Sequence, residues 1–176
     1  PAEFYMPATD AATGRATYFS KYDIVRDDYR AVMASCALPG FCRPVKVGDR
    51  YYYDGGVADS IPLHHAIEQG CTKMVVILSN PRNFVKKPEA HRPLYKHMLH
   101  KYPKTIQSID NRHINYQASI NLASRLEKEG YVFIFAPSRH MPLSTFSKDA
   151  ALEQDLYDLG VADYEARAEE LKYFLN

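Results

Sequence analysis

Two short, uninterrupted apolar runs, at residues 74–78 and 131–136, constrain the fold of this chain more than any other feature. Each run is too short for a helix and fits a strand that is covered on both faces, as in a parallel sheet. Between them, residues 105–128 follow a helical pattern, in which mainly apolar residues recur along one face as a stripe. The stripe consists of Ile106, Ile109, His113, Tyr116, Ile120 and Ala123. Strands that alternate with helices indicate an α/β fold.

The N-terminal third has the turn residues of β-hairpins. Residues 4–8 and 15–20 are predicted strands joined at 9–14, where Asp10 is expected to form an Asx-type turn. Residues 45–53 predict a second hairpin, which turns at Gly48 and Asp49. A helix is expected after Asp27 and Asp28. Its predicted core face consists of Tyr29, Val32, Met33 and Cys36.

The remaining segments are expected to belong to a single domain over residues 1–176. A helix is predicted to begin near Pro62, where Asp59 and Ser60 can cap it. Residues 80–104 are basic and rich in proline, which predicts a loop or flap. Two C-terminal helices are expected on either side of Gly160. The last is predicted to present Tyr164, Ala168, Leu171 and Leu175 on one face.

Two buried strands are few for a complete parallel sheet. Either missing N-terminal strands complete the sheet, or a second copy of the chain does so through an open edge, which would make a homo-oligomer. Because the chain opens with Pro1 and not with an initiator Met, we expect a further N-terminal segment.

Composition argues against several classes of function. Apolar residues make up 46% of the chain and charged residues 24%, as in ordinary globular proteins. The net charge of +1 supplies no field that would attract nucleic acid, so no nucleic-acid partner is expected. No apolar run approaches the roughly 18 residues of a membrane span. Cys36, Cys42 and Cys71 lack metal-ligand spacing and are expected to be buried free thiols in the reducing cytoplasm, and a Cys36–Cys42 disulfide is the alternative.

Charge is unevenly distributed along the chain. Between Arg82 and Lys104 the only acid is Glu89, whereas the tail from Lys148 onward is predominantly acidic. One interpretation is a pair of solvated faces. The other is a basic flap that contacts anionic lipid headgroups, which would place the protein peripherally at a membrane.

The sequence around Asp54 has the pattern of an active-site base. An aromatic strand precedes the acid, and Gly55 and Gly56 follow it. Glycines leave room for close contact with a neighbouring group, and a partly desolvated carboxylate in short contact with a hydroxyl can accept its proton. An ordinary Asp-Gly turn is the structural alternative.

An ordered series of motifs around this acid resembles the patatin-like phospholipases, especially their small bacterial members. The series begins with Ala-Thr-Asp-x-x-Thr-Gly at residues 8–14 and continues through 34–45 to Asp-Gly-Gly-Val-x-Asp-Ser-Ile-Pro-Leu at 54–63. It continues from Arg112 through the long helix to 129–137. The resemblance implies a partial three-layer α/β/α fold, with a mostly parallel sheet and a β-hairpin region.

The resemblance also implies a serine lipid acyl hydrolase with a Ser-Asp dyad. The dyad aspartate of the family falls on Asp54, and Gly55 and Gly56 would shape the substrate site. The family's serine lies on a Gly-x-Ser-x-Gly turn and a Gly-rich loop forms its oxyanion hole; the serine turn is absent from these 176 residues. We therefore expect the chain to be the C-terminal portion of such an enzyme, inactive alone, with a lipid or acyl-ester substrate.

The residues leave other functions open. The chain can be a non-catalytic binding or interaction domain that retains the fold, or a phosphate-binding module that uses the helix N-terminus near Ser60. An internal triad of Asp54, Ser60 and His64 would require Ser60 to be a nucleophile and not a helix cap. His113 is expected to be a core histidine with a hydrogen-bond partner or, alternatively, a ligand. No metal site and no cofactor are expected.

Overall fold

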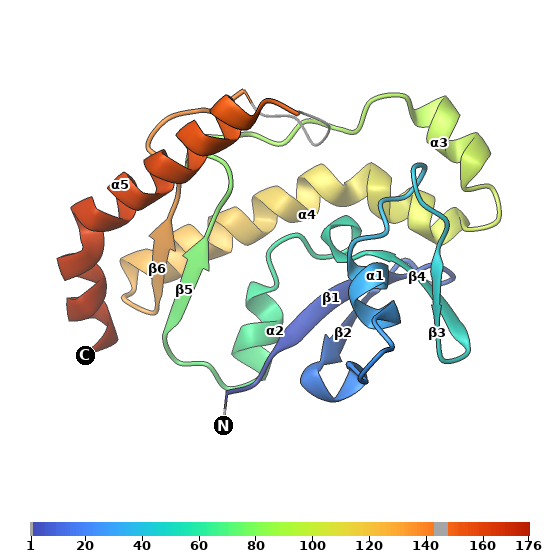
Figure 1. Ribbon diagram of the computed structural model, residues 1–176, viewed down its shortest axis with the longest axis horizontal. Coiled ribbons are helices and arrows are strands. Elements are labelled where there is room, and N and C mark those ends of the chain that lie inside the picture. Colours follow the sequence, from blue (N-terminus) through green and yellow to red (C-terminus); the bar gives the residue numbers. More distant parts are fainter. Residues whose placement is uncertain (1, 143–147) are drawn as a thin grey trace. The chain divides into compact units, whose positions relative to one another are not determined.

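The computed structural model describes residues 2–142 and 148–176, which form two compact units (Figure 1). Unit 1 comprises Pro1–Pro62 and Lys86–Ser119, and unit 2 comprises Leu63–Val85 and Ile120–Asn176. The long helix α4, Pro103–Lys128, therefore begins in unit 1 and ends in unit 2. Whether residues 1–176 fold as one domain stays a prediction.

Unit 1 is built on a four-stranded antiparallel sheet in the order β2-β1-β4-β3. Its strands are β1 (Tyr5–Asp10), β2 (Ala16–Ser20), β3 (Val45–Val47) and β4 (Arg50–Asp54). Both predicted hairpins are confirmed, and the second turns through two residues, with Val47 opposite Arg50. The central pairing joins β1 to β4, with Ala8 opposite Asp54. All three pairings are antiparallel, and short turns impose two of them, so the prediction of a mostly parallel sheet is wrong for these four strands.

The two faces of this sheet carry separate apolar clusters. Tyr52 and Tyr53 are neighbours on β4 and point to opposite faces, because side chains alternate along a strand. The first cluster contains Met6, Ala8, Phe19, Ala31, Ala34 and Tyr52. The second contains Ala11, Tyr53, Val57, Leu99, Ile106 and Ile109. Helix α1 (Arg30–Ser35) thus packs on one face, and the residues from Leu99 into α4 pack on the other.

The predicted core face of α1 is wrong. Ala31 and Ala34 are buried, whereas Tyr29 and Met33 are each more than half exposed. The small alanine side chains let the helix approach β1, β3 and β4 closely, and the larger residues are therefore turned outward.

The predicted flap at 80–104 is less irregular than expected. It contains helix α3 (Arg92–Met98), in which Pro93 stands in the first turn, and α4 begins at Pro103. Unit 1 also contains two short 3₁₀ helices, η1 (Lys21–Asp23) and η2 (Gly55–Val57).

Unit 2 contains helix α2 (Leu63–Glu68) and a parallel pair of strands, β5 (Met74–Ile77) and β6 (Val132–Phe135). Strand β6 is buried as predicted, with Val132 and Ile134 each 2% exposed. Strand β5 is not covered on both faces as expected, because Val75 and Ile77 are exposed. Helix α5 (Ala150–Leu175) packs on β6, with Phe174 against Phe133 and Tyr164 near Phe135.

Two further expectations are corrected by the structure. Gly160 lies inside α5, which is one continuous helix and not two, because a single glycine costs a helix only about 1 kcal/mol. The thiols of Cys36, Cys42 and Cys71 are free but belong to exposed residues. None of the helices in residues 2–142 and 148–176 combines the length and the hydropathy that a membrane-spanning helix requires.

Candidate active site at Asp54

Asp54 is the last residue of β4, and its backbone is fixed on both sides. Its N–H donates to the carbonyl of Ala37 at 2.9 Å, and its carbonyl accepts from the hydroxyl of Thr9 at 2.7 Å. Thr9 is fully buried, and its oxygen also accepts from the N–H of Ala58 at 3.2 Å. One hydroxyl thereby ties both ends of the turn 54–58 to β1.

The carboxylate of Asp54 is half-buried and held at one oxygen. Oδ1 accepts a hydrogen bond of 2.7 Å from the backbone N–H of Gly56, which makes Asp54 the N-cap of η2. Within the described part of the chain, Oδ2 has no hydrogen-bond partner. The arrangement holds one oxygen in place and leaves the second able to accept a proton from a hydroxyl.

Gly55 and Gly56 each require the absence of a side chain, for different structural reasons. A Cβ atom on Gly55 would lie 2.1 Å from the carbonyl oxygen of Pro7, so only glycine fits against β1. The same carbonyl accepts a hydrogen bond of 2.7 Å from Ser35 Oγ, which fixes its direction. A Cβ atom on Gly56 would lie 3.1 Å from Asp54 Oδ1 and 3.4 Å from Arg112 Nη2, and would crowd the carboxylate.

A cluster of charged residues on the far side of Gly56 was not predicted as part of the site. The carbonyl of Gly56 accepts from Arg112 Nε at 2.6 Å, and Arg112 Nη1 donates to Glu89 at 2.9 Å. Lys86 lies 3.7 Å from the same carboxylate. Burial and the nearby Arg112 charge lower the pKa of Lys86, and Glu89 only partly opposes them. Arg112 stood in a motif of the resemblance, which was the only signal that could have pointed to it.

The other candidates of the sequence take structural roles. Ser60 Oγ donates to the Gly56 carbonyl at 2.7 Å, and within the described residues no hydrogen bond joins it to Asp54 or His64. The internal triad is therefore not assembled. The expected Asx turn is confirmed, because Asp10 Oδ1 accepts from the N–H groups of Ala12 and Thr13.

His113 lacks the hydrogen bond that was expected at one ring nitrogen. Its Nδ1 is buried and has no partner among the residues that the structure describes. Across the same residues, no cluster of three or more His, Cys, Asp or Glu side chains has the geometry to hold a metal ion.

Two segments of the chain match different families. Residues 7–67 match the family of patatin-like phospholipases, and residues 102–176 match a domain of unknown function, DUF6363. An uncharacterized protein of Escherichia coli (strain K12), YjjU, is 39% identical over 59 residues. That match covers 33% of this chain and only 16% of the relative's length. The resemblance to patatin-like phospholipases is thus confirmed over 7–67, the segment that contains Asp54, Gly55 and Gly56.

Proposed function

We propose that this chain supplies the base of a serine acyl hydrolase, with Asp54 as the partner of a serine from outside residues 1–176. The observation that carries the proposal is the fixed carboxylate of Asp54, held by Gly56 N–H at a strand end within the patatin-like segment. The serine comes from a longer form of this chain or from a second protein, because no Gly-x-Ser-x-Gly turn occurs here.

In the proposed reaction Asp54 accepts the hydroxyl proton of the serine as the serine oxygen attacks the ester carbonyl carbon. The tetrahedral intermediate collapses, and the leaving alcohol takes the proton from Asp54. Water then attacks the acyl-enzyme, giving its proton to Asp54, and the released serine oxygen recovers a proton from the same carboxyl group. Asp54 thus ends each cycle ionised.

The neighbouring residues act on this base by position. Gly55 lets the turn rest directly on Pro7, and Gly56 supplies the N–H that orients the carboxylate. Arg112 holds the Gly56 carbonyl and so keeps that N–H in place. As part of the same proposal, strands from outside residues 1–176 complete the sheet of a three-layer α/β/α fold around this site.

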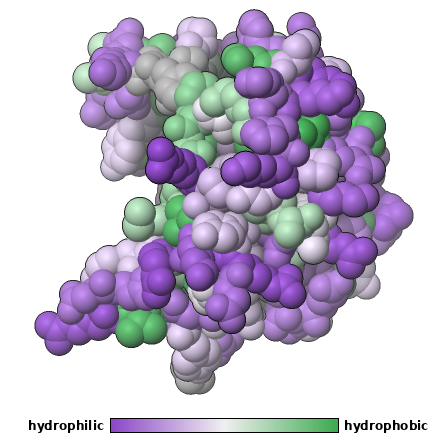
Figure 2. Space-filling model, turned by 90° about the vertical axis from the view of Figure 1, so that its right-hand side faces the viewer, coloured by the Kyte–Doolittle hydropathy of each residue, from purple (hydrophilic) through white to green (hydrophobic). Residues whose placement is uncertain are grey.

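The proposed substrate is a lipid or another acyl ester, approached from a membrane surface in the cytoplasm. The basic stretch between Arg82 and Lys104 supports contact with anionic headgroups through charge. Figure 2 shows a face that is hydrophilic over most of its area, with hydrophobic side chains in separate groups. That face offers little continuous apolar surface for insertion into a bilayer.

The test compares Asp54→Asn with Asp49→Asn in the longest form of the protein that contains a Gly-x-Ser-x-Gly turn. We expect Asp54→Asn to lower kcat on a p-nitrophenyl ester by about 10²–10⁴-fold, with KM little changed, because the lost function is proton transfer. Labelling of the serine by a fluorophosphonate should slow in parallel. Asp49 lies in an exposed hairpin turn, so Asp49→Asn should keep full activity.

Two outcomes would contradict the proposal. Full turnover by the Asp54→Asn variant would show that Asp54 is not the base, and would favour a non-catalytic binding domain. Ester turnover by residues 1–176 alone, abolished by Ser60→Ala, would show that the nucleophile lies inside this chain.

A further inference from the structure

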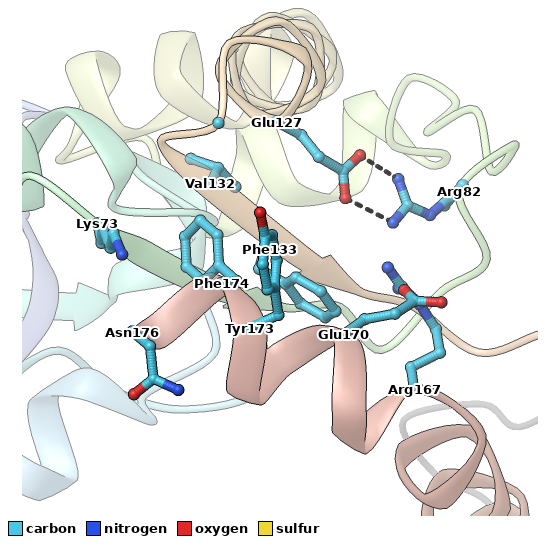
Figure 3. Close-up of a pocket in the computed structure, with 11 residues that line it drawn as sticks. Lys73, Arg82, Glu127, Val132, Phe133, Arg167, Glu170, Tyr173, Phe174 and Asn176 are labelled. Atoms are coloured by element: carbon cyan, nitrogen blue, oxygen red, sulfur yellow. Dashed lines mark hydrogen bonds and ion pairs between the residues drawn. The ribbon is translucent and has the colours of Figure 1, made fainter.

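An open pocket of about 810 Å³ lies in unit 2, and every residue that lines it belongs to that unit (Figure 3). Its volume falls within the roughly 300–1,000 Å³ of typical small-ligand sites. Its walls come from the segments just before and after β5, the end of α4, β6 and the C-terminal part of α5. We call it the basic-aromatic pocket, defined by Lys73, Arg82, Val132, Phe133, Arg167 and Phe174.

Cations and aromatic rings form a continuous row along this pocket. Lys73 Nζ lies 5.6 Å from the ring centre of Phe174, whose ring centre is 5.7 Å from that of Phe133. The guanidinium carbon of Arg167 is 4.4 Å from the ring centre of Phe133. The pocket therefore has a positive group at each end of an apolar wall.

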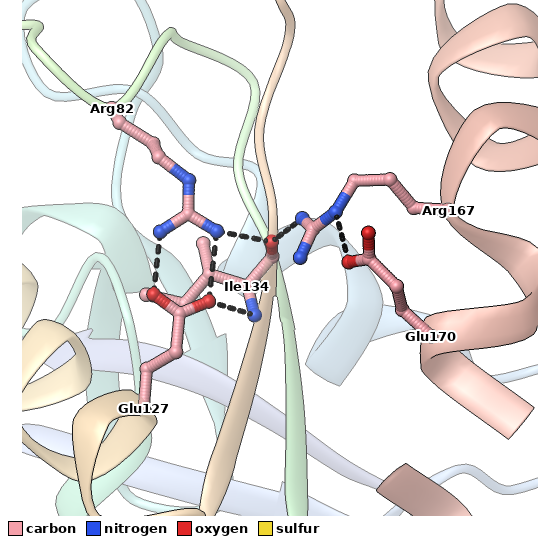
Figure 4. Close-up of polar contacts among 5 residues, drawn as sticks. All are labelled: Arg82, Glu127, Ile134, Arg167 and Glu170. Atoms are coloured by element: carbon pink, nitrogen blue, oxygen red, sulfur yellow. Dashed lines mark hydrogen bonds and ion pairs between the residues drawn. The ribbon is translucent and has the colours of Figure 1, made fainter. Parts of the chain in front are cut away.

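Two guanidinium groups converge on one carbonyl at the arginine end (Figure 4). Arg82 and Arg167 donate to the oxygen of Ile134 at 2.8 and 2.7 Å. Glu127 pairs with Arg82 through two hydrogen bonds and also accepts from the N–H of Ile134. Arg82 is thus fixed as part of the wall, and its charge is compensated by Glu127.

Arg167 is held by a more exposed carboxylate than Arg82 is. Its Nε donates to Glu170 at 2.9 Å, but the Glu170 side chain is 61% exposed, and such an exposed pair is weak. Within residues 2–142 and 148–176, Nη2 of Arg167 has no hydrogen-bond partner, and Lys73 has no ion pair. Among the lining side chains, three cations stand beside two carboxylates, and the free donors of Arg167 and the amine of Lys73 are the groups left for an anionic ligand.

We propose that the basic-aromatic pocket binds a small amphiphilic anion, with a carboxylate or phosphate head on Arg167 and an apolar chain along Phe133 and Phe174. The guanidinium fork matches the oxygens of either head, and Glu170 gives way to them. Lys73 adds positive potential at the far end of the row. The pocket shares no residue with the site at Asp54, so this proposal stands or fails independently of the proposed hydrolase function.

The test is calorimetric titration of residues 1–176 with decanoate, decyl phosphate, decylamine, acetate and inorganic phosphate. Decanoate or decyl phosphate should bind, and the tighter of the two identifies the head. Octanoate should bind several-fold more weakly than decanoate, because each methylene that is buried adds hydrophobic free energy. Acetate, inorganic phosphate and decylamine should not bind at the same concentrations.

Variants locate the site on the row of cations and rings. Arg167→Met should weaken binding by about tenfold or more, because a charge-assisted hydrogen bond to the head is lost. Glu170→Gln should tighten binding by about two- to fivefold, because the competing carboxylate is removed. Lys73→Met should cause a smaller loss that disappears at high salt. The matched control is Arg125→Met, which breaks only an exposed ion pair with Glu129.

Three results would overturn the proposal. They are equal binding by the Arg167→Met and Arg125→Met variants, weaker binding by Glu170→Gln, and binding of decylamine or acetate as tight as that of decanoate. Glu170→Gln and Lys73→Met leave the Arg167–Ile134 contact intact, so these outcomes are measured even where Arg167→Met fails to fold.

Discussion

A Cβ atom on Gly55 would lie 2.1 Å from the carbonyl oxygen of Pro7, far inside van der Waals contact. At this point strand β1 and the turn after Asp54 therefore meet backbone to backbone. Since Ala8, the next residue of β1, is paired with Asp54, this contact and the strand pairing together fix the backbone that carries the carboxylate.

Gly55→Ala should lower the free energy of unfolding by about 1–3 kcal/mol or more, because the added methyl group forces β1 and η2 apart. Urea denaturation measures the loss. Gly160→Ala is the matched control, since Gly160 lies within α5 and a Cβ there meets no atom within 4 Å. It should instead stabilise the protein by about 0.5–1 kcal/mol. Equal effects of the two substitutions would contradict the close packing at Gly55.

Thr9→Val should destabilise the protein by about 1–3 kcal/mol, because the Asp54 carbonyl and the Ala58 N–H both lose the same hydroxyl partner. Thr9→Ser keeps both hydrogen bonds and loses one methyl group, so it should cost less. Thermal unfolding of both variants distinguishes the hydroxyl from the methyl. If Thr9→Ser were as damaging as Thr9→Val, the hydrogen bonds of Thr9 would not be what stabilises the turn.

Local signals predicted much of the fold. The two-residue turn at Gly48 and Asp49 fixed a hairpin, and the stripe on α4 correctly placed Ile106 and Ile109 in the core. The core face of helix α1 was predicted wrongly because its buried face consists of alanines, whereas a hydropathy pattern favours the larger apolar side chains for the core. The exposure of Val75 and Ile77 on β5 likewise depends on what covers the strand, which its apolar composition cannot report.

The candidate site was predicted only where its residues are close together in the sequence. Asp54, Gly55 and Gly56 are consecutive, so a motif can identify them, although their catalytic role stays a prediction. Arg112 reaches the Gly56 carbonyl across 56 residues of sequence, and only tertiary structure brings the two together.

Asp10→Asn should remove a stabilising contribution that depends on pH. Burial alone would raise the pKa of Asp10, but hydrogen bonds from Thr13, Arg50 and Ala12 outweigh it and hold the pKa below its ordinary value of 3.8. A carboxylate whose pKa is depressed by folding stabilises the protein above its unfolded-state pKa. That contribution is lost as the pH falls through the folded-state value.

The difference in unfolding free energy between wild type and Asp10→Asn should therefore be largest at neutral pH, about 1–2 kcal/mol. It should shrink as the pH falls through the lowered pKa of Asp10 in the folded protein. Denaturation series at several pH values measure it. A difference that grows on acidification would mean that the pKa of Asp10 is raised in the folded protein.

Arg82 and Glu127 should show measurable coupling in a double-mutant cycle with Arg82→Met and Glu127→Gln. Besides the two hydrogen bonds between them, Arg82 and Glu127 each form a hydrogen bond with the backbone of Ile134. The side chain of Arg82 is 47% exposed and that of Glu127 is 26% exposed. Hydrogen bonding to Arg82 is the main reason that the pKa of Glu127 is lowered, and burial opposes it. We expect a coupling of about 1 kcal/mol, between that of an exposed and a buried pair.

The matched cycle on Arg125 and Glu129, whose nitrogen and oxygen lie 3.9 Å apart in a more exposed setting, should give a smaller value. Equal coupling in the two cycles would mean that the contacts with Ile134 add nothing to the Arg82–Glu127 pair.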